Sequence, residues 1–283
     1  MEGEPLLSGK TCVVTGASSG IGRATAGQLV ALGARVILVC RQSSRGEEAA
    51  AHMNAQGWPG STALLTADLA SQAQVRRLAD DLSGEERLDV LVHNAGVYQP
   101  RRTLSEDGIE TTLAVNHLAP FLLTHLLLDT LRRSRPSRVV TLASIAAEHG
   151  RIRFDDLGGE RRYLGLRAYC QSKLANVVFT AELARRLEET DVDANCVHPG
   201  FVRTGLGRQS LTGRAFFTVF GSRMLTPEQG AATTVHVSSA PGLAGVSGKF
   251  FTGLASAREA ASAADASVAG RLWEVSARLT GVG

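Results

Sequence analysis

The sequence lacks the features that mark nucleic-acid-binding and membrane-spanning proteins. Its 283 residues carry 30 Lys and Arg against 27 Asp and Glu, and a net charge of +3 gives no strong field for a nucleic acid or a charged membrane. No run of about 18 consecutive apolar residues is present, so no transmembrane segment is expected. The first residues, MEGEPLLSGK, hold no basic segment followed by an apolar run, so no signal peptide is expected either.

Cysteine is scarce and lies outside any redox motif. The chain has four cysteines, and no two of them form CxxC. Most lie in or beside apolar runs such as TCVVT and ILVC, so we expect small buried side chains in a reducing compartment. No cluster of His, Cys and Asp has the spacing of metal ligands. We therefore expect a cytoplasmic protein without a catalytic metal.

What the sequence does contain is a regular alternation of strand-like and helix-like segments. Short apolar runs rich in β-branched residues alternate with amphipathic stretches. Strands are expected at 10–15, 34–40, 61–69, 88–96, 137–144 and 193–200, and helices at 21–33, 43–56, 71–82, 109–133 and 169–189. The Ala-rich stretch 255–270 is expected to pack loosely before a last helix, RLWEVSARLTG.

This alternation predicts βαβ units and a parallel sheet covered on both faces. Strands follow one another too closely for an inserted second domain, and no low-complexity linker interrupts them. We expect an α/β protein in which residues 1–283 form a single-domain, Rossmann-type doubly wound parallel sheet of about seven strands with helices on both faces.

A glycine-rich loop follows the first expected strand. VVTGASSGIGRATA places Gly16, Gly20 and Gly22 in a GxxxGxG spacing between a strand and a helix. Glycine lets the backbone turn tightly and approach a phosphate, and the helix start offers free N–H groups and the positive end of its dipole. Because further βα units follow, the loop predicts a dinucleotide site; a merely tight turn is the alternative.

The end of the second expected strand indicates which dinucleotide binds. NAD sites place an acidic residue there to bind the ribose 2′-OH. This sequence has Arg41 instead, and no acid before Glu47. Because a guanidinium can pair with a 2′-phosphate, we predict NADP(H) in preference to NAD(H). The alternative is that Arg41 is only a solvated residue at a strand end.

A series of motifs, in order along the chain, resembles the short-chain dehydrogenase/reductase family. They are TGASSGIG (15–22), HNAG (93–96), the Asn116 segment VNHLAPFLLT, Ser144, Tyr169-x-x-x-Lys173 and HPGFVRT (198–204). The resemblance runs from about Lys10 to Phe251. The segments AYCQSKLANVVFTAEL and VNHLAPFLLTHLLL are similar to the retinol dehydrogenase-like branch of the family.

The resemblance implies a catalytic set of Ser144, Tyr169, Lys173 and Asn116. Tyr169 would be the general acid/base; a free phenol has a pKa of about 10, which a nearby cation lowers. Lys173, one helical turn on, would supply that cation and hold the nicotinamide ribose. Ser144 would donate a hydrogen bond to the substrate oxygen, and Asn116 would hold a water that links Lys173 to bulk solvent. Alternatively, Ser144 is a simple cap and Asn116 an ordinary polar residue of its helix.

The resemblance also implies cofactor contacts in the loops that follow the strands. They are Gly16, Ser18, Ser19, Gly20, Ile21 and Gly22 at the pyrophosphate, Arg41, Asp68 and Leu69 at the adenosine, Asn94, Ala95 and Gly96 at its ribose, Tyr169 and Lys173, and Pro199, Gly200, Val202 and Thr204 at the nicotinamide. All these loops leave the carboxyl ends of strands, where ligands bind in open α/β sheets. His93 and His198 are expected to be structural.

We expect the substrate to meet residues 204–225, a lid segment that carries Phe216, Phe217 and Phe220. The alternative is that these rings only pack the segment onto the core or form a subunit contact. Retinoid, steroid, fatty aldehyde and polyketide-type carbonyls all stay open as substrates.

The expected function is NADP(H)-dependent interconversion of a carbonyl and an alcohol on an apolar small molecule, by an oxidoreductase that acts on CH–OH donors. A catalytically silent NADPH-binding regulator or scaffold of the same fold is the second hypothesis. An epimerase or dehydratase of the extended relatives is the third, although no long C-terminal domain follows. A homodimer or homotetramer would pair through the long helices that carry Asn116 and Tyr169.

Overall fold

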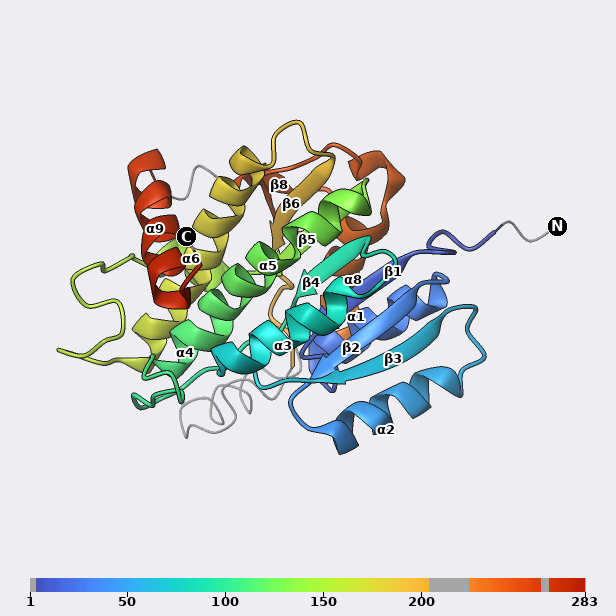
Figure 1. Cartoon of the computed structure of the whole chain (residues 1–283), viewed down its shortest axis with the longest axis horizontal. Helices are drawn as coiled ribbons and strands as arrows, with labels where there is room; N and C mark the ends of the chain where they lie inside the picture. Colours follow the sequence, from blue (N-terminus) through green and yellow to red (C-terminus); the bar gives the residue numbers. More distant parts are fainter. Residues whose placement is uncertain (1–3, 204–223, 261–264, 283) are drawn as a thin grey trace.

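Figure 1 shows a computed structural model of the chain, in which residues 4–203, 224–260 and 265–282 are described. Within these residues, eight strands form one sheet in the order β3-β2-β1-β4-β5-β6-β7-β8. The parallel strands are β1 (Thr11–Thr15), β2 (Arg35–Cys40), β3 (Ser61–Thr66), β4 (Val90–His93), β5 (Ser137–Leu142), β6 (Val192–Val197) and β7 (Lys249–Phe251). The predicted doubly wound α/β sheet is confirmed.

An eighth strand, β8 (Ala257–Glu259), pairs antiparallel with β7. It lies within 255–270, so the expectation of loose packing there is wrong for this part. A short hairpin joins β7 to β8, and in it the N–H of Thr252 donates to the carbonyl oxygen of Ser256 (2.9 Å). All three residues of β8 are exposed, and no alternation of apolar and polar residues in the sequence predicts this edge strand.

Helices cover both faces of the sheet (Figure 1). One face carries α1 (Gly20–Ala31), α2 (Ser43–Asn54) and α8 (Pro227–Ser239), and the other carries α3 (Gln72–Ser83), α5 (Ala119–Arg133) and α6 (Gly165–Arg186). Successive strand side chains point to opposite faces, so Val13 of β1 joins the core under α5 and Val14 the core under α1. Burial of strands on both faces explains why they are continuous apolar runs in the sequence.

The last helix, α9 (Ala266–Thr280), packs across α5 and α6 through an aromatic cluster. The ring of Trp273 lies edge-on to Phe121 of α5 at a centroid distance of 4.9 Å and stacks on Phe179 of α6 at 6.0 Å. The guanidinium of Arg186 lies over the other side of the indole, 4.2 Å from its centre. The helix therefore covers part of both long helices.

The predicted helix 109–133 is not a regular α-helix. It comprises α4 (Thr111–Leu113), a π-helical turn η1 (Ala114–Leu118) and α5. In the π turn, the N–H of Ala119 bonds to the carbonyl oxygen of Ala114, and Pro120, which has no N–H to donate, follows directly. The proline therefore stands where the helical ladder is already out of register.

By length and composition, Thr111–Arg133 is the one described helix apolar enough to cross a membrane, with a mean hydropathy of 1.3 over its best window. That window is 78% buried inside the protein. Its hydropathy therefore reflects packing between the sheet and α9.

Candidate active site

Two loops meet at the carboxyl ends of β1 and β4, on either side of the point where the strand order reverses. Thr15, the last residue of β1, joins them, because its Oγ1 accepts hydrogen bonds from the N–H groups of Asn94 (3.0 Å) and Ala95 (3.1 Å). The Nδ2 of Asn94 donates in return to the carbonyl oxygen of Thr15 (2.7 Å). The loops are thus held as one unit at the switch point, where open α/β sheets bind ligands.

The glycine loop presents a helix N-terminus to this point. Gly16 and Gly20 have φ of +68° and +54°, a region that favours glycine. A Cβ on Gly22 would overlap Asn94 and the carbonyl oxygen of Gly16, so only glycine permits this packing. The N-cap residue, Ser19, makes no side-chain capping bond, and the first turn of α1 has no acid. Its N–H groups are therefore available to a pyrophosphate, and the residues present fit a dinucleotide.

The loops after β2 and β3 extend this edge. Arg41 directly follows β2, and its side chain is exposed. Asp68 shapes its own turn: its Oδ1 accepts from the N–H of Ala70 (2.9 Å), and its N–H donates to Oε1 of Gln74 (2.9 Å). Ser18 and Ile21 lie in the glycine loop, each partly buried.

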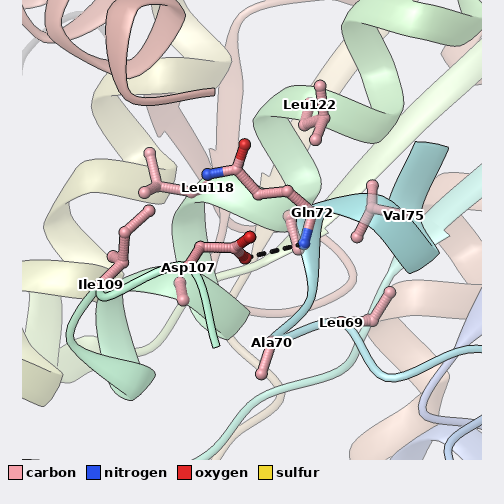
Figure 2. Close-up of a pocket in the computed structure, with 10 residues that line it drawn as sticks. Leu69, Ala70, Gln72, Val75, Asp107, Ile109, Leu118 and Leu122 are labelled. Atoms are coloured by element: carbon pink, nitrogen blue, oxygen red, sulfur yellow. Dashed lines mark hydrogen bonds between the residues drawn. The ribbon is translucent and has the colours of Figure 1, made fainter. Parts of the chain in front are cut away.

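Leu69 lines a small apolar cavity together with Leu118 and Leu122 (Figure 2). One wall is fixed by the N–H of Gln72, which donates to the carboxylate of Asp107 (2.9 Å). The side chain of Leu69 therefore takes part in packing between α3 and the long helix, and a cofactor at this position would meet its backbone.

Helix α6 carries a stripe of polar side chains on one face. Tyr169, Ser172, Lys173 and Asn176 follow at i, i+3, i+4 and i+7. Lys173 is 4% exposed, and its Nζ donates to the carbonyl oxygen of Leu142 at the end of β5 (2.9 Å). The Nδ2 of Asn176 donates to the same oxygen (3.2 Å). The ammonium lies 5.8 Å from the centre of the Tyr169 ring, so the phenol and the cation are neighbours.

Burial dominates the pKa values of this pair. It raises the pKa of Tyr169 to about 12, and a hydrogen bond with Ser144 acts in the opposite direction. Burial also lowers the pKa of Lys173 to about 8. The pKa of the phenol is thus raised, opposite to the direction in which a nearby cation would move it. The lowering by Lys173 stays a prediction.

Asn116 lies in the π turn and is fully buried. Its Oδ1 accepts from the N–H of Val97 (2.7 Å), and its Nδ2 donates to the carbonyl oxygen of Val97 (3.0 Å) and to Oγ of Ser172 (3.0 Å). A Cβ on Gly96 would lie 3.5 Å from both Asn116 Oδ1 and Lys173 Nζ. Asn116 therefore ties the loop after β4 to α6, next to Lys173.

Ser144 follows β5 and has both of the roles considered for it. Its Oγ caps the short 3-10 helix η2 (Ile145–His149) by accepting from the N–H of Ala146 (3.2 Å). It also lies close enough to the Tyr169 phenol to lower the pKa of that phenol. The two side chains are therefore neighbours.

Backbone bonds join the loop after β6 to Leu225, the last residue of the predicted lid. Leu225 donates its N–H to the carbonyl oxygen of Phe201 (2.8 Å) and accepts at its own carbonyl oxygen from the N–H of Arg203 (3.0 Å). Gly200 has a φ of +85°, and Val202 is buried against Gly230. Pro199 is partly buried beside them; Thr204, Phe216, Phe217 and Phe220 lie outside the described residues.

The two histidines near the site are buried and neutral. His93 shares a hydrogen bond of 2.6 Å with Thr124, and burial lowers its pKa to about 3. Burial also lowers the pKa of His198. In the described part of the chain, no group of three or more His, Cys, Asp and Glu residues could hold a metal ion.

Three site residues were missed from the sequence: Thr15, Ser172 and Asn176. Thr15 bridges the loops after β1 and β4, and Ser172 links Asn116 to the carbonyl oxygen of Tyr169, to which its Oγ donates (2.8 Å). The signal for two of them was present, because Ser172 and Asn176 fall at helical spacing on the same face as Tyr169 and Lys173. Thr15 is the first residue of the TGASSGIG motif, but the motif alone does not show that its hydroxyl bridges two loops.

Comparison with known proteins agrees with this geometry. The model of the short chain dehydrogenase family matches residues 10–215. The chain belongs to this family. It is therefore an oxidoreductase of a family that binds a nicotinamide cofactor.

Relatives of this family member include retinol dehydrogenases. It is 44% identical over 296 residues to retinol dehydrogenase 14 of Mus musculus, covering 99% of this chain and 89% of that protein. It is 43% identical over 284 residues to retinol dehydrogenase 13 of Homo sapiens, covering 98% and 86%. The predicted resemblance to the retinol dehydrogenase-like branch is confirmed.

Solved structures of the family share the fold. An uncharacterized protein from Mycobacterium Paratuberculosis has a TM-score of 0.78 and 34% identity, with coverage of 98% of this chain and 96% of that one. A short chain dehydrogenase from Burkholderia cenocepacia J2315, in complex with NADP, has a TM-score of 0.70 and 28% identity, with coverage of 87% and 96%.

Proposed function

We propose that the protein interconverts a carbonyl and an alcohol on an apolar small molecule with NADP(H), and that Tyr169 is its acid/base. The observation that carries the proposal is the arrangement at the end of β5, where the Tyr169 phenol has Ser144, which lowers its pKa, and Lys173 as neighbours. This arrangement adjoins the loops that fit a dinucleotide. When bound, the nicotinamide supplies a hydride acceptor or donor for the substrate carbon.

The chain's own residues orient the substrate and move the proton. The hydroxyl groups of Ser144 and Tyr169 hold the carbonyl oxygen and stabilise the negative charge that grows on it during reduction. At neutral pH a phenol with a pKa of about 12 is protonated, so Tyr169 can give its proton to that oxygen. Lys173 then provides a positive charge beside the phenolate. Asn116, with a water, would link Lys173 to bulk solvent and so restore the proton.

The decisive test is Tyr169→Phe, which removes one hydroxyl and keeps the ring. Positioned acid–base groups contribute about 10²–10⁴-fold, so we expect turnover to fall by at least about 100-fold. NADPH affinity, measured by fluorescence titration, should stay within about twofold, because the pyrophosphate and adenosine contacts come from other loops. The test uses a panel of apolar aldehydes, ketones and secondary alcohols.

Wild-type-like turnover by Tyr169→Phe would contradict the assignment of Tyr169 as the acid/base. If the wild-type protein bound NADPH but turned over no member of the panel, the catalytically silent regulator would be the better account. Tyr163→Phe removes a phenolic hydroxyl that has no role in the proton transfer itself, so it should lose far less turnover than Tyr169→Phe.

The preference for NADP(H) rests on Arg41. It is exposed at the end of β2, where a guanidinium can reach a 2′-phosphate, and no acid precedes Glu47. The complex of the Burkholderia cenocepacia dehydrogenase with NADP supports the same choice.

Arg41→Asp should move the preference toward NAD(H), because a carboxylate accepts from a ribose 2′-OH and repels a phosphate. We expect the ratio of kcat/KM for NADPH over NADH to fall by at least about tenfold, the equivalent of about 1.4 kcal/mol. Arg45→Asp, in the first turn of α2, is the control for a change of net charge. An unchanged ratio in Arg41→Asp would remove the argument for NADP(H).

The names of the retinol dehydrogenase relatives support an apolar alcohol or aldehyde as substrate. Three Phe in the proposed lid segment 204–225 support it further. We also propose that the enzyme works in the cytoplasm, because all four of its cysteines are free and buried, as in a reducing compartment.

A further inference from the structure

The three tyrosines of the chain are connected through the segment Val97–Pro100, since Tyr98 contacts Tyr169 and Tyr163 is bonded to Gln99. The rings of Tyr98 and Tyr169 are in edge-to-face contact, with centroids 6.1 Å apart and planes at 72°. The hydroxyl of Tyr163 lies 2.9 Å from the carbonyl oxygen of Gln99 and 3.0 Å from Oε1 of Glu110, and its single proton is shared between these two acceptors. Only 5% of the residues of the chain are aromatic, so three connected tyrosines beside one site are unusual.

The segment Val97–Pro100, which carries Tyr98, is held from two sides. Both backbone groups of Val97 are bonded to the buried amide of Asn116. On the other side, a Cβ on Gly165 would overlap the carbonyl oxygen of Gln99, so α6 begins in direct contact with this segment. The segment is therefore fixed between the π turn and the start of the helix that carries Tyr169.

A buried carboxylate completes the attachment. Glu110 is 3% exposed and accepts from the N–H groups of Thr112 (2.9 Å) and Leu113 (2.8 Å), so it caps the helical turn that leads into the π turn. The same carboxylate accepts from Tyr163. One group thus joins the segment before α6, which carries Tyr163, to the helix that carries Asn116.

Among the described aromatic side chains, Tyr98 is the only one in ring contact with Tyr169. An edge-to-face pair has a preferred geometry, so the Tyr98 ring restricts the orientation of its neighbour. A phenol that must transfer a proton has to be held close to one position, because small displacements of reacting groups cost rate.

We propose that Tyr98 is a positioning residue for Tyr169, acting through its ring, and that the Tyr163–Glu110 hydrogen bond holds the segment that presents it. The proposal rests on the proposed function, because orientation of the phenol matters only if Tyr169 transfers the proton. The hydroxyl of Tyr98 has no part in it.

The test compares Tyr98→Leu, which removes the ring, with Tyr98→Phe, which keeps it. We expect kcat to fall about tenfold or more in Tyr98→Leu, while Tyr98→Phe stays within about twofold of the wild type. KM for NADPH should not change in either variant. The alkaline limb of the kcat–pH profile for reduction should move to lower pH in Tyr98→Leu only, because loss of the ring exposes the Tyr169 phenol to water.

Tyr163→Phe gives an independent result that leaves the Tyr98 and Tyr169 side chains in place. It should lower kcat severalfold with an unchanged KM for NADPH, and it decides the matter if Tyr98→Leu does not fold, as judged by circular dichroism. A folded Tyr98→Leu with wild-type kcat and pH profile would overturn the proposal. An equal loss of kcat in Tyr98→Phe would also overturn it. If Tyr98→Leu cannot be folded, a fully active Tyr163→Phe would overturn it.

The failure of this proposal is distinct from the failure of the proposed function. If Tyr169→Phe abolishes turnover but Tyr98→Leu is fully active, only the positioning role is lost. If Tyr169→Phe is active, or the wild type has no turnover, both fall together.

Discussion

At the scale of single residues, burial sets the charge states at the centre of the site. It moves both Tyr169 and Lys173 toward their neutral forms, with pKa values of about 12 and about 8. The phenol is consequently a proton donor at neutral pH. At neutral pH the lysine is still largely charged, because its pKa of about 8 lies above 7, and its buried ammonium is bonded to the Leu142 carbonyl. The charged ammonium of Lys173 therefore lowers the stability of the folded protein at neutral pH.

Replacing that lysine should stabilise the protein and change the pH dependence of its stability. Because the pKa in the folded chain is lowered from 10.5 to about 8, the unfolded chain binds more protons between these values. The contribution of Lys173 to the free energy of unfolding therefore rises from pH 8 to pH 10.5, and the cost of the buried charge is fully present below pH 8.

Lys173→Met should remove this slope and raise the free energy of unfolding at about pH 7 by roughly 2–3 kcal/mol, while abolishing turnover. The Leu142 carbonyl keeps its bond from Asn176. Urea unfolding of both proteins at about pH 7 and about pH 9.5 measures the effect; the upper value stays below the range in which Tyr169 titrates. Equal slopes for the two proteins would contradict the assigned pKa.

At the scale of elements, the two long helices serve packing on one side and chemistry on the other. Helix α6 turns its polar stripe toward β5 and packs Phe179 against α9. The π turn at Asn116 widens the neighbouring helix at the position that meets Ser172. Two copies that pair through these helices, as the sequence predicts, would have to use the parts that α9 leaves free.

The attachment of α9 should depend on one side chain, Trp273, which touches both long helices and Arg186. Trp273 is only partly buried. Trp273→Ala should therefore lower the free energy of unfolding by about 2–4 kcal/mol, at or below the usual range for a core tryptophan. Trp273→Phe keeps an aromatic ring, so the free energy of unfolding should fall by less than half as much.

Urea unfolding followed by circular dichroism measures both Trp273 variants, and Trp58→Ala provides the matched loss of an indole on the opposite face of the sheet. A loss below about 0.5 kcal/mol in Trp273→Ala would show that the aromatic cluster does not hold the helix.

At the scale of the whole molecule, the sheet order assembles the site. Reversal of strand order at β1 brings the loops after β1 and β4 together, although they are far apart in sequence. β5 and β6 then place Ser144 and the loop at Gly200 farther along the same edge. Alternation of strands and helices was enough to predict this architecture, because buried parallel strands and amphipathic helices leave clear periodic signals.

Other features could not be predicted from periodicity or motifs. All three residues of the edge strand β8 are exposed, so it carries no apolar pattern. The pKa of Tyr169 depends on the depth of burial, which a spacing of four residues does not report. The contact of Tyr98 with Tyr169 joins residues on different segments and is a property of the tertiary structure alone.

The central claim, that Tyr169 serves a hydride transfer from NADPH to an apolar carbonyl, is tested most directly by following the hydride itself. NADPH deuterated at the transferred position of the nicotinamide C4 is mixed with the wild type or Tyr169→Phe and an apolar aldehyde, and the alcohol is analysed by mass spectrometry. The account predicts one deuterium on the carbinol carbon with the wild type, and formation of this product at least about 100-fold slower with Tyr169→Phe. Unlabelled alcohol, or labelled alcohol formed equally fast by both proteins, would contradict it.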